Sequence, residues 1–378
     1  MKITKIRHYV LENPEGHGRT NLLEQVPDLL RIQYRHCGEA RGPARQSFIE
    51  VETDAGITGR CTTAMRSDEA EVLRRHVIGE NPLDRERLFQ MLHKGTRWVY
   101  NHRGWFGDFD NCLWDIAGKH AGVPVYELVG RVRTRFPVYV TGGDASLADY
   151  LRVIEKIRVF GVMAYKVHTY KGGKADVPIL AGLRKETGPD FALINDPVCS
   201  YTLREAIEVG HVMEELDYVW LEEPMHEQKM HLYQQLCDAL TIPVMSNETL
   251  MYDMDLSAEW LIQGATDRLR GNARNGTTQV LKMAHFAELY GTNIELNGQG
   301  GLFGLLHAHL GCCIDNTDYY EYSSSGEAGD GLRKAGTQWG LLNAPLVEDG
   351  HLAPPTGAGW GAEWDEKRFK SLVVEMRE

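Results

Sequence analysis

The hydrophobic and polar positions of the chain follow two rhythms, which change about a third of the way along it. In the first part, residues 3–11 and 47–60 alternate as β-strands do, and the turn Asp-Ala-Gly-Ile within 47–60 predicts a hairpin. Residues 12–46 between them are a long polar connection, and connections of this length are usually lids or disordered segments. From about residue 68 to 120 the pattern becomes helical. We therefore expect an N-terminal α+β domain over residues 1–125.

Residues 126–345 repeat a strand–helix unit with short links, which is typical of parallel strands. Helical segments separate the predicted strands, which cover residues 137–143, 162–170, 191–197, 218–224, 241–249, 267–272 and 292–298. About seven or eight such units predict a closed β/α barrel. An open doubly wound sheet is the alternative, but no glycine-rich phosphate turn follows the first strand. Residues 346–378 are irregular, and we expect them to pack back on the first domain.

Composition narrows the possible partners. The chain has 378 residues, a formal net charge of −12 and a 25% content of charged residues, which fits a soluble enzyme and argues against nucleic acid or an anionic membrane as partner. No run of about 18 apolar residues is present, so no membrane span is expected. Seven scattered cysteines without a C-x-x-C pair fit reduced thiols in a cytoplasmic protein.

Three successive predicted strands end in a carboxylate. Asp196 in INDP, Glu222 in LEEP and Glu248 in SNET are 26 residues apart, which is one β/α unit each time. In a parallel barrel the strand ends meet on one face, so these groups should converge at the same height. Converging carboxylates repel one another unless a cation lies between them, and all-oxygen ligation suits Mg²⁺. The alternative is that they are ordinary acids that cap the following helices. Glu223 should point the other way and is expected to be structural.

The stretch YKVHTY ends the strand that precedes INDP. Lys166 and His168 are two positions apart, so a strand would direct both toward the carboxylates. A histidine with its usual pKa of about 6.5 can remove the proton α to a substrate carboxylate, and a lysine can hold that carboxylate and stabilise the enediolate. A surface lysine beside a core histidine is the other interpretation.

Together these motifs resemble the enolase superfamily, and within it the mandelate racemase group. The resemblance also covers residues 112–130, residues 276–291 and the closing PPTGAGWGAEWD. It implies a modified TIM barrel of the (β/α)7β type with an N-terminal capping domain whose loop closes over the substrate. It further implies that Mg²⁺ binds to the three strand-end carboxylates and that His168 acts as the base. Glu321 in YYEYSSS matches an acid that members often carry at the end of the last strand.

The chain also departs from that group. Racemases and many dehydratases there carry an Asp–His pair on the sixth and seventh strands, where this chain has Arg270 and Asn297. Neither is a base at neutral pH, so two-base racemisation is in doubt. Asn297 is a candidate for binding a substrate hydroxyl, and Arg270 or Arg274 for binding a second anionic end. In the lid, His17, Arg19, Arg41 and Arg45 are further candidates for substrate binding, although solvated loop charges are the plainer interpretation.

The sequence thus favours a Mg²⁺-dependent dehydratase of a sugar acid, an aldonate or aldarate, which eliminates the β-hydroxyl to give a 2-keto-3-deoxy acid. A cycloisomerase, epimerase or racemase of a related carboxylate would use the same first step. A non-catalytic barrel is the rival from another class, but such a chain would be expected to lose the base or the carboxylates. The expected partner is a small sugar acid, and a homo-oligomer is expected by resemblance.

Overall fold

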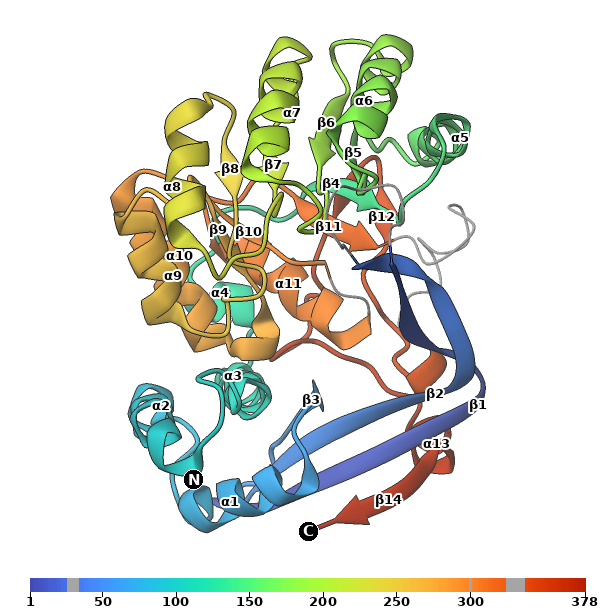
Figure 1. Cartoon of the computed structure of the whole chain (residues 1–378). Helices are drawn as coiled ribbons and strands as arrows, with labels where there is room; N and C mark the ends of the chain where they lie inside the picture. Colours follow the sequence, from blue (N-terminus) through green and yellow to red (C-terminus); the bar gives the residue numbers. More distant parts are fainter. Residues whose placement is uncertain (26–33, 299–300, 324–336) are drawn as a thin grey trace.

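The computed structural model describes residues 1–25, 34–298, 301–323 and 337–378, with side chains described except at 17–25, 34–41, 301, 323 and 337. The N-terminal part is a four-stranded antiparallel sheet with helices packed beside it, and it lies below the barrel in Figure 1. Its strand order is β14-β1-β2-β3, so the sheet joins both ends of the sequence. The strands are β1 (Ile3–Gln25), β2 (Tyr34–Thr53), β3 (Thr58–Thr63) and β14 (Val373–Arg377).

The expected polar connection over residues 12–46 is largely a hairpin arm rather than a loop. Strands β1 and β2 stay paired from Gly18 opposite Gly42 out to Gln25 opposite Tyr34. Figure 1 shows this hairpin curving up along one side of the molecule toward the barrel. The sequence missed this because main-chain pairing needs no apolar face, and alternation was the signal used to predict strands.

Helices α1 to α4 follow β3 in the chain; α1, α2 and α3 lie in the stretch predicted to be helical, whereas α4 lies beyond its end. Their bounds are α1 (Ser67–Val77), α2 (Arg85–Val99), α3 (Gly107–Ala121) and α4 (Val125–Val129). Helix α3 is the most buried of them, because its residues Gly107–Asn111 lie between the sheet and the barrel.

The barrel has eight parallel strands in the described residues, in the order β8-β7-β6-β5-β4-β11-β10-β9. A parallel bridge between Met245 and Arg268 links the two outer strands and brings the barrel close to closure. The strands are β4 (Phe136–Thr141), β5 (Ala164–Val167), β6 (Ala192–Asn195), β7 (Leu221–Glu222), β8 (Val244–Met245), β9 (Leu269–Gly271), β10 (Ile294–Leu296) and β11 (Tyr320–Ser323). The connecting helices are α5 (Leu147–Arg158), α6 (Gly173–Thr187), α7 (Leu203–Glu215), α8 (Met230–Ala239), α9 (Met254–Ile262), α10 (Thr277–Tyr290) and α11 (Gly301–Cys313). The predicted (β/α)7β barrel with a capping domain is confirmed.

The sequence pattern did not predict helix α11. Its residues from Leu302 to Cys313 are all buried, so it has no polar face and no helical periodicity that a sequence pattern would reveal. It packs so closely on β4 that a Cβ atom on Gly311 would lie 1.9 Å from the ring of Phe136.

The C-terminal segment returns to the first domain. Strands β12 (Val347–Glu348) and β13 (His351–Leu352) form a hairpin that pairs with β4, and α13 (Glu366–Ser371) leads into β14. Phe369 of α13 packs edge-on against Phe48 of β2, with ring centroids 5.1 Å apart. Within the described parts of the chain, no helix is both long enough and apolar enough to cross a membrane.

Buried polar side chains of α3 join the cap to the barrel. Helix α10 has no capping side chain of its own, and the capping domain supplies the missing acceptors. Asp110 accepts hydrogen bonds from the backbone N–H and hydroxyl of Thr278, at 2.8 and 2.7 Å. Asn111 accepts two from Thr277, at 3.0 and 2.8 Å, and donates to the carbonyl of Ala273 at 2.7 Å. The first turn of α10 is therefore completed by the capping domain.

Candidate active site

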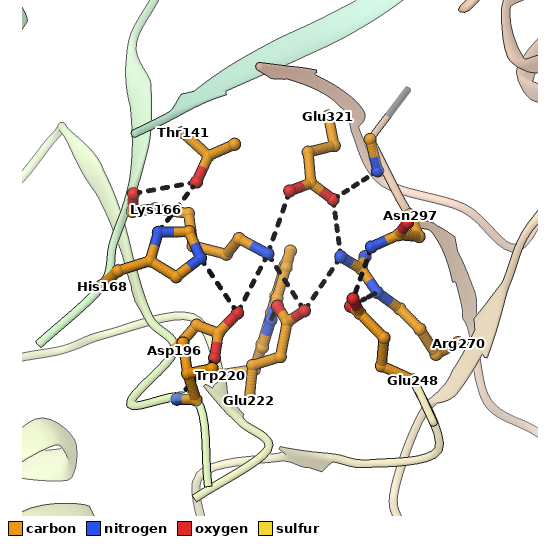
Figure 2. Close-up of polar contacts among 12 residues, drawn as sticks. Thr141, Lys166, His168, Asp196, Trp220, Glu222, Glu248, Arg270, Asn297 and Glu321 are labelled. Carbon is orange, nitrogen blue, oxygen red and sulfur yellow. Dashed lines mark hydrogen bonds and ion pairs between the residues drawn. The ribbon is translucent and has the colours of Figure 1, made fainter. Parts of the chain in front are cut away.

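The inner wall of the barrel has two layers, which follow from the period of two along each strand. The lower layer is an apolar cluster of Tyr139, Ala164, Ile194, Trp220 and Met245. Two residues further along three of these strands, the same wall carries Lys166, Asp196 and Glu222, all buried. The strand ends thus place charged groups on top of an apolar floor, and Figure 2 shows these charged groups together with Trp220.

Lys166 lies at the centre of the charged layer. Its Nζ is 3.0 Å from Glu222 Oε1, 3.0 Å from Glu321 Oε1 and 3.4 Å from Asp196 Oδ2. Burial alone would lower the pKa of Lys166, but Glu222 and Glu321 outweigh it and hold the pKa well above its usual value. The lysine is therefore a permanent cation that ties β5 to β6, β7 and β11.

His168 follows β5 and lies beside Asp196, with Nε2 at 3.2 Å from Asp196 Oδ2 (Figure 2). Its Nδ1 contacts the carbonyl oxygen of Gly142 and lies 3.3 Å from Thr141 Oγ1. A carbonyl oxygen only accepts, so Nδ1 keeps its hydrogen and Nε2 is the nitrogen that gains or loses a proton. Burial lowers the pKa of His168 and Asp196 raises it, with a net rise above the usual value.

Arg270 on β9 is fully buried and contacts three carboxylates. Its Nη2 lies 2.9 Å from Glu222 Oε1 and 2.5 Å from Glu321 Oε2, and its Nε lies 3.3 Å from Glu248 Oε2. Asn297 on β10 donates to the same Glu248 Oε2 at 2.8 Å. Most of the Arg270 guanidinium is thus committed to neighbouring acids, and Nη1 is the nitrogen without a hydrogen-bond partner among the described residues.

The remaining acid contacts hold each carboxylate in place. Glu222 Oε2 accepts from the indole N–H of Trp220 at 3.1 Å, and Glu321 Oε2 accepts from the backbone N–H of Gly298 at 2.7 Å. Burial alone would raise the pKa of Asp196, but Lys166 and His168 lower it to about 2. Glu248 is the more exposed of the three predicted metal ligands, at 31% of its side chain, so it lies toward the mouth of the site.

The backbone is strained where the carboxylates emerge. Positive φ angles occur at Val198 and Cys199 after β6, at Glu223 after β7 and at Asn247 after β8. Non-glycine residues rarely adopt this region, and such strain gathers at functional sites. Glu223 is buried, and burial together with the negative charge of Glu248 raises its pKa well above the usual value.

The charge of the cluster suits a divalent cation. Four carboxylates, Asp196, Glu222, Glu248 and Glu321, face two permanent cations, so the ionised cluster has an excess of two negative charges. Hard oxygen donors with this charge fit Mg²⁺. In the described ranges no three His, Cys, Asp or Glu side chains are close enough to hold a metal as they stand, because lysine and arginine nitrogens contact the oxygens that it would need.

The predicted lid residues are less informative. Arg45 forms an ion pair with Glu12 at 2.6 Å and is 71% exposed, so its contacts resemble those of a solvated surface charge. His17, Arg19 and Arg41 lie on β1 and β2, but their side chains are outside the described part of the structure. Arg274 is exposed beyond the end of β9.

Sequence reasoning missed three residues of the site. Thr141 contacts His168, and Trp220 contacts Glu222. Asn272 donates to Asn297 Oδ1 at 3.0 Å. The residue of β9's end that contacts Asn297 is therefore Asn272, which lies two residues after Arg270. The period of two offered a signal for Asn272, since 268, 270 and 272 share a face.

Known proteins resemble this chain over nearly its whole length. Residues 149–368 match the family described as "Enolase C-terminal domain-like", and residues 33–130 match "Mandelate racemase / muconate lactonizing enzyme, N-terminal domain". D-galactarolactone cycloisomerase of Agrobacterium fabrum is 29% identical over 314 residues, which cover 78% of each chain. D-galactonate dehydratase of Ralstonia pickettii is 26% identical over 373 residues, covering 89% of this chain and 92% of the relative.

A solved structure agrees with these sequence matches. D-glucarate dehydratase from Agrobacterium tumefaciens, complexed with magnesium, superimposes with a TM-score of 0.85 and 28% identity, over 99% of this chain and all of the other. The barrel, the capping domain and the matches across both domains lead to one assignment. The chain belongs to the enolase superfamily, in its mandelate racemase and muconate lactonizing enzyme group.

Proposed function

We propose that the protein is a Mg²⁺-dependent dehydratase of a sugar acid, an aldonate or aldarate, that yields a 2-keto-3-deoxy acid. The observation that supports this most directly is the position of His168. Its Nδ1 is fixed by the Gly142 carbonyl, and its Nε2 faces the carboxylate cluster beside the buried Lys166. This is an arrangement for removing a proton next to a carboxylate.

In this proposal Asp196, Glu222 and Glu248 hold the metal. Bound Mg²⁺ would act as a Lewis acid that makes the α-proton more acidic. His168 Nε2 takes up that proton, and Lys166 neutralises the negative charge that develops on the substrate carboxylate. The β-hydroxyl then leaves with a proton, which His168 can return. Asn297 and Arg270 Nη1, which has no hydrogen-bond partner within the described ranges, are proposed to donate hydrogen bonds to substrate oxygens.

The groups on the other side of the barrel favour elimination over racemisation. The ends of β9 and β10 present Arg270, Asn272 and Asn297. None of the three takes up a proton near neutral pH, whereas inversion requires a base on each face of the substrate. Glu321, on β11, is held ionised by Lys166 and Arg270, which lower its pKa far below the usual value against the effect of burial, so it is a poor base.

A cycloisomerase, or an epimerase of a related carboxylate, is the second candidate. It is supported by the 29% identity to a relative named D-galactarolactone cycloisomerase, a match of the same quality as those to the dehydratases. Such an enzyme would need the same proton removal, and only the fate of the resulting anion would differ.

Proton NMR in D₂O distinguishes these candidates. The protein with Mg²⁺ is incubated with a set of monoacid and diacid sugars and their lactones. Loss of the C2 proton together with a new deoxy-methylene signal is expected. Exchange at C2 without elimination would favour an epimerase, a ring-opened product would favour a cycloisomerase, and no change with any compound would contradict the proposal.

The variant H168N tests the assignment of the base. Asparagine keeps a polar side chain of similar size but cannot accept a proton, so solvent exchange at C2 should fall by at least about a hundredfold. Mg²⁺ binding, measured by calorimetry, should persist. Exchange at the wild-type rate in this variant would show that His168 is not the base.

A further inference from the structure

Arg270 binds the acids that the proposed function assigns to the metal. The guanidinium contacts Glu222 Oε1 and Glu248 Oε2, and Glu222 Oε1 also receives Lys166 (Figure 2). Arg270 and Glu222 are both 0% exposed, whereas the side chain of Glu248 is 31% exposed. Two of the three proposed metal ligands are thus already paired with a buried cation that comes from the chain itself.

Such an arrangement has two opposing consequences. Glu222, Glu248 and Glu321 all contact one guanidinium, and Arg270 compensates their mutual repulsion when no metal is bound. With a metal, the same positive charge lies close to a second cation and competes for the same oxygens. An arginine guanidinium stays protonated in proteins, so this charge cannot be released as a proton.

We propose that Arg270 is a counter-ion supplied by the chain itself, which keeps the proposed metal ligands in place in the folded protein when no metal is bound. The positive charge of Arg270 also weakens metal binding. Arg270 is in this sense a positioning residue for Glu222 and Glu248. The inference rests on the metal assignment of the proposed function, and it goes beyond the substrate-binding role suggested by the sequence.

The test compares R270M with R268M by thermal unfolding, with and without Mg²⁺ as the only added ligand. Arg268 is a matched control, because it lies two residues earlier on the same face. It forms its own ion pairs with Glu295 at 2.9 Å and Asp318 at 2.6 Å, one layer below the site. Both variants remove a guanidinium from the barrel interior, but R268M removes it from acids that are not proposed metal ligands.

Wild type should unfold cooperatively without divalent metal. Metal-free R270M should unfold roughly 5 °C lower. Saturating Mg²⁺ should restore most of that loss in R270M, and calorimetry should show Mg²⁺ binding about tenfold tighter than in wild type. R268M should lose stability equally with and without Mg²⁺, and its Mg²⁺ affinity should be that of wild type.

Three results would overturn the inference. They are a wild type that is unfolded without metal, an R270M as stable as wild type without metal, and equal Mg²⁺-induced shifts in R270M and wild type. If R270M does not fold, R270Q replaces it, since glutamine is neutral but can still donate to the acids. Absence of Mg²⁺ binding to wild type would refute the metal assignment and this inference together, whereas equal shifts refute the inference alone.

Discussion

The carboxyl of Asp108 should make the stability of the protein fall as pH rises. Asp108 is the second residue of α3 and is 4% exposed; one oxygen accepts from Thr63 Oγ1 at 2.6 Å and from the backbone N–H of Ala64 at 3.2 Å. Its other oxygen is buried without a partner among the described residues. Burial outweighs both hydrogen bonds and raises the pKa of Asp108 from 3.8 to about 7.

The magnitude follows from linkage. Between the unfolded pKa and the folded one, the folded state binds more protons, so the stabilising contribution is complete at low pH and is lost as pH rises through about 7. A pKa difference of roughly three units corresponds to about 4 kcal/mol in total, at 1.36 kcal/mol per unit. Of this, roughly 2–3 kcal/mol should be lost between pH 5 and pH 8.

The assay is urea unfolding of wild type and D108N at pH 5 and pH 8. Asparagine has the same shape but does not ionise. From pH 5 to pH 8, the free energy of unfolding of D108N should therefore rise by roughly 2–3 kcal/mol relative to that of wild type, whatever the difference between the two proteins at pH 5. D190N removes an exposed carboxylate and controls for net charge. If the difference between wild type and D108N is the same at both pH values, the reasoning about Asp108 is wrong.

Three further changes test other parts of the structure. E222Q should lose Mg²⁺ binding and turnover together, because it neutralises a proposed metal ligand that contacts both buried cations; Mg²⁺ affinity retained in calorimetry would contradict the metal assignment. N111A should lower the free energy of unfolding by about 2–3 kcal/mol, since its barrel partners lose three hydrogen bonds; a urea midpoint like that of wild type would disprove this. G311A should lower the free energy of unfolding by at least about 2 kcal/mol, because its Cβ would lie 1.9 Å from Phe136. The second change F136L should restore part of this stability, and a G311A variant as stable as wild type would refute the close packing.

The sequence predicted the architecture well because the barrel repeats its own signal. Strand–helix alternation and a 26-residue spacing placed Asp196, Glu222 and Glu248 at equal heights, and the structure brings these side chains into one charged layer. Where this signal is missing, prediction failed: α11 has no polar face, and the arms of the β1–β2 hairpin alternate too weakly.

The partners of Arg270 could not be predicted in the same way. A period of two shows that the residue points into the barrel, but not which inward neighbour a long side chain reaches. Arg270 reaches acids from β7, β8 and β11, and the last of these lies 51 residues away in sequence. The register of β9 and β10, in contrast, places Asn272 beside Asn297.

The pairing of β14 with β1 bears on how the chain is made. His8 to Leu11 of β1 pair with residues 373–377, and the whole barrel lies between these two strands in sequence. A ribosome must therefore synthesise the complete barrel before the capping sheet can gain its fourth strand. Until then the outer edge of β1 exposes unpaired backbone groups, which makes the growing chain a substrate for chaperones and a risk for strand-to-strand aggregation.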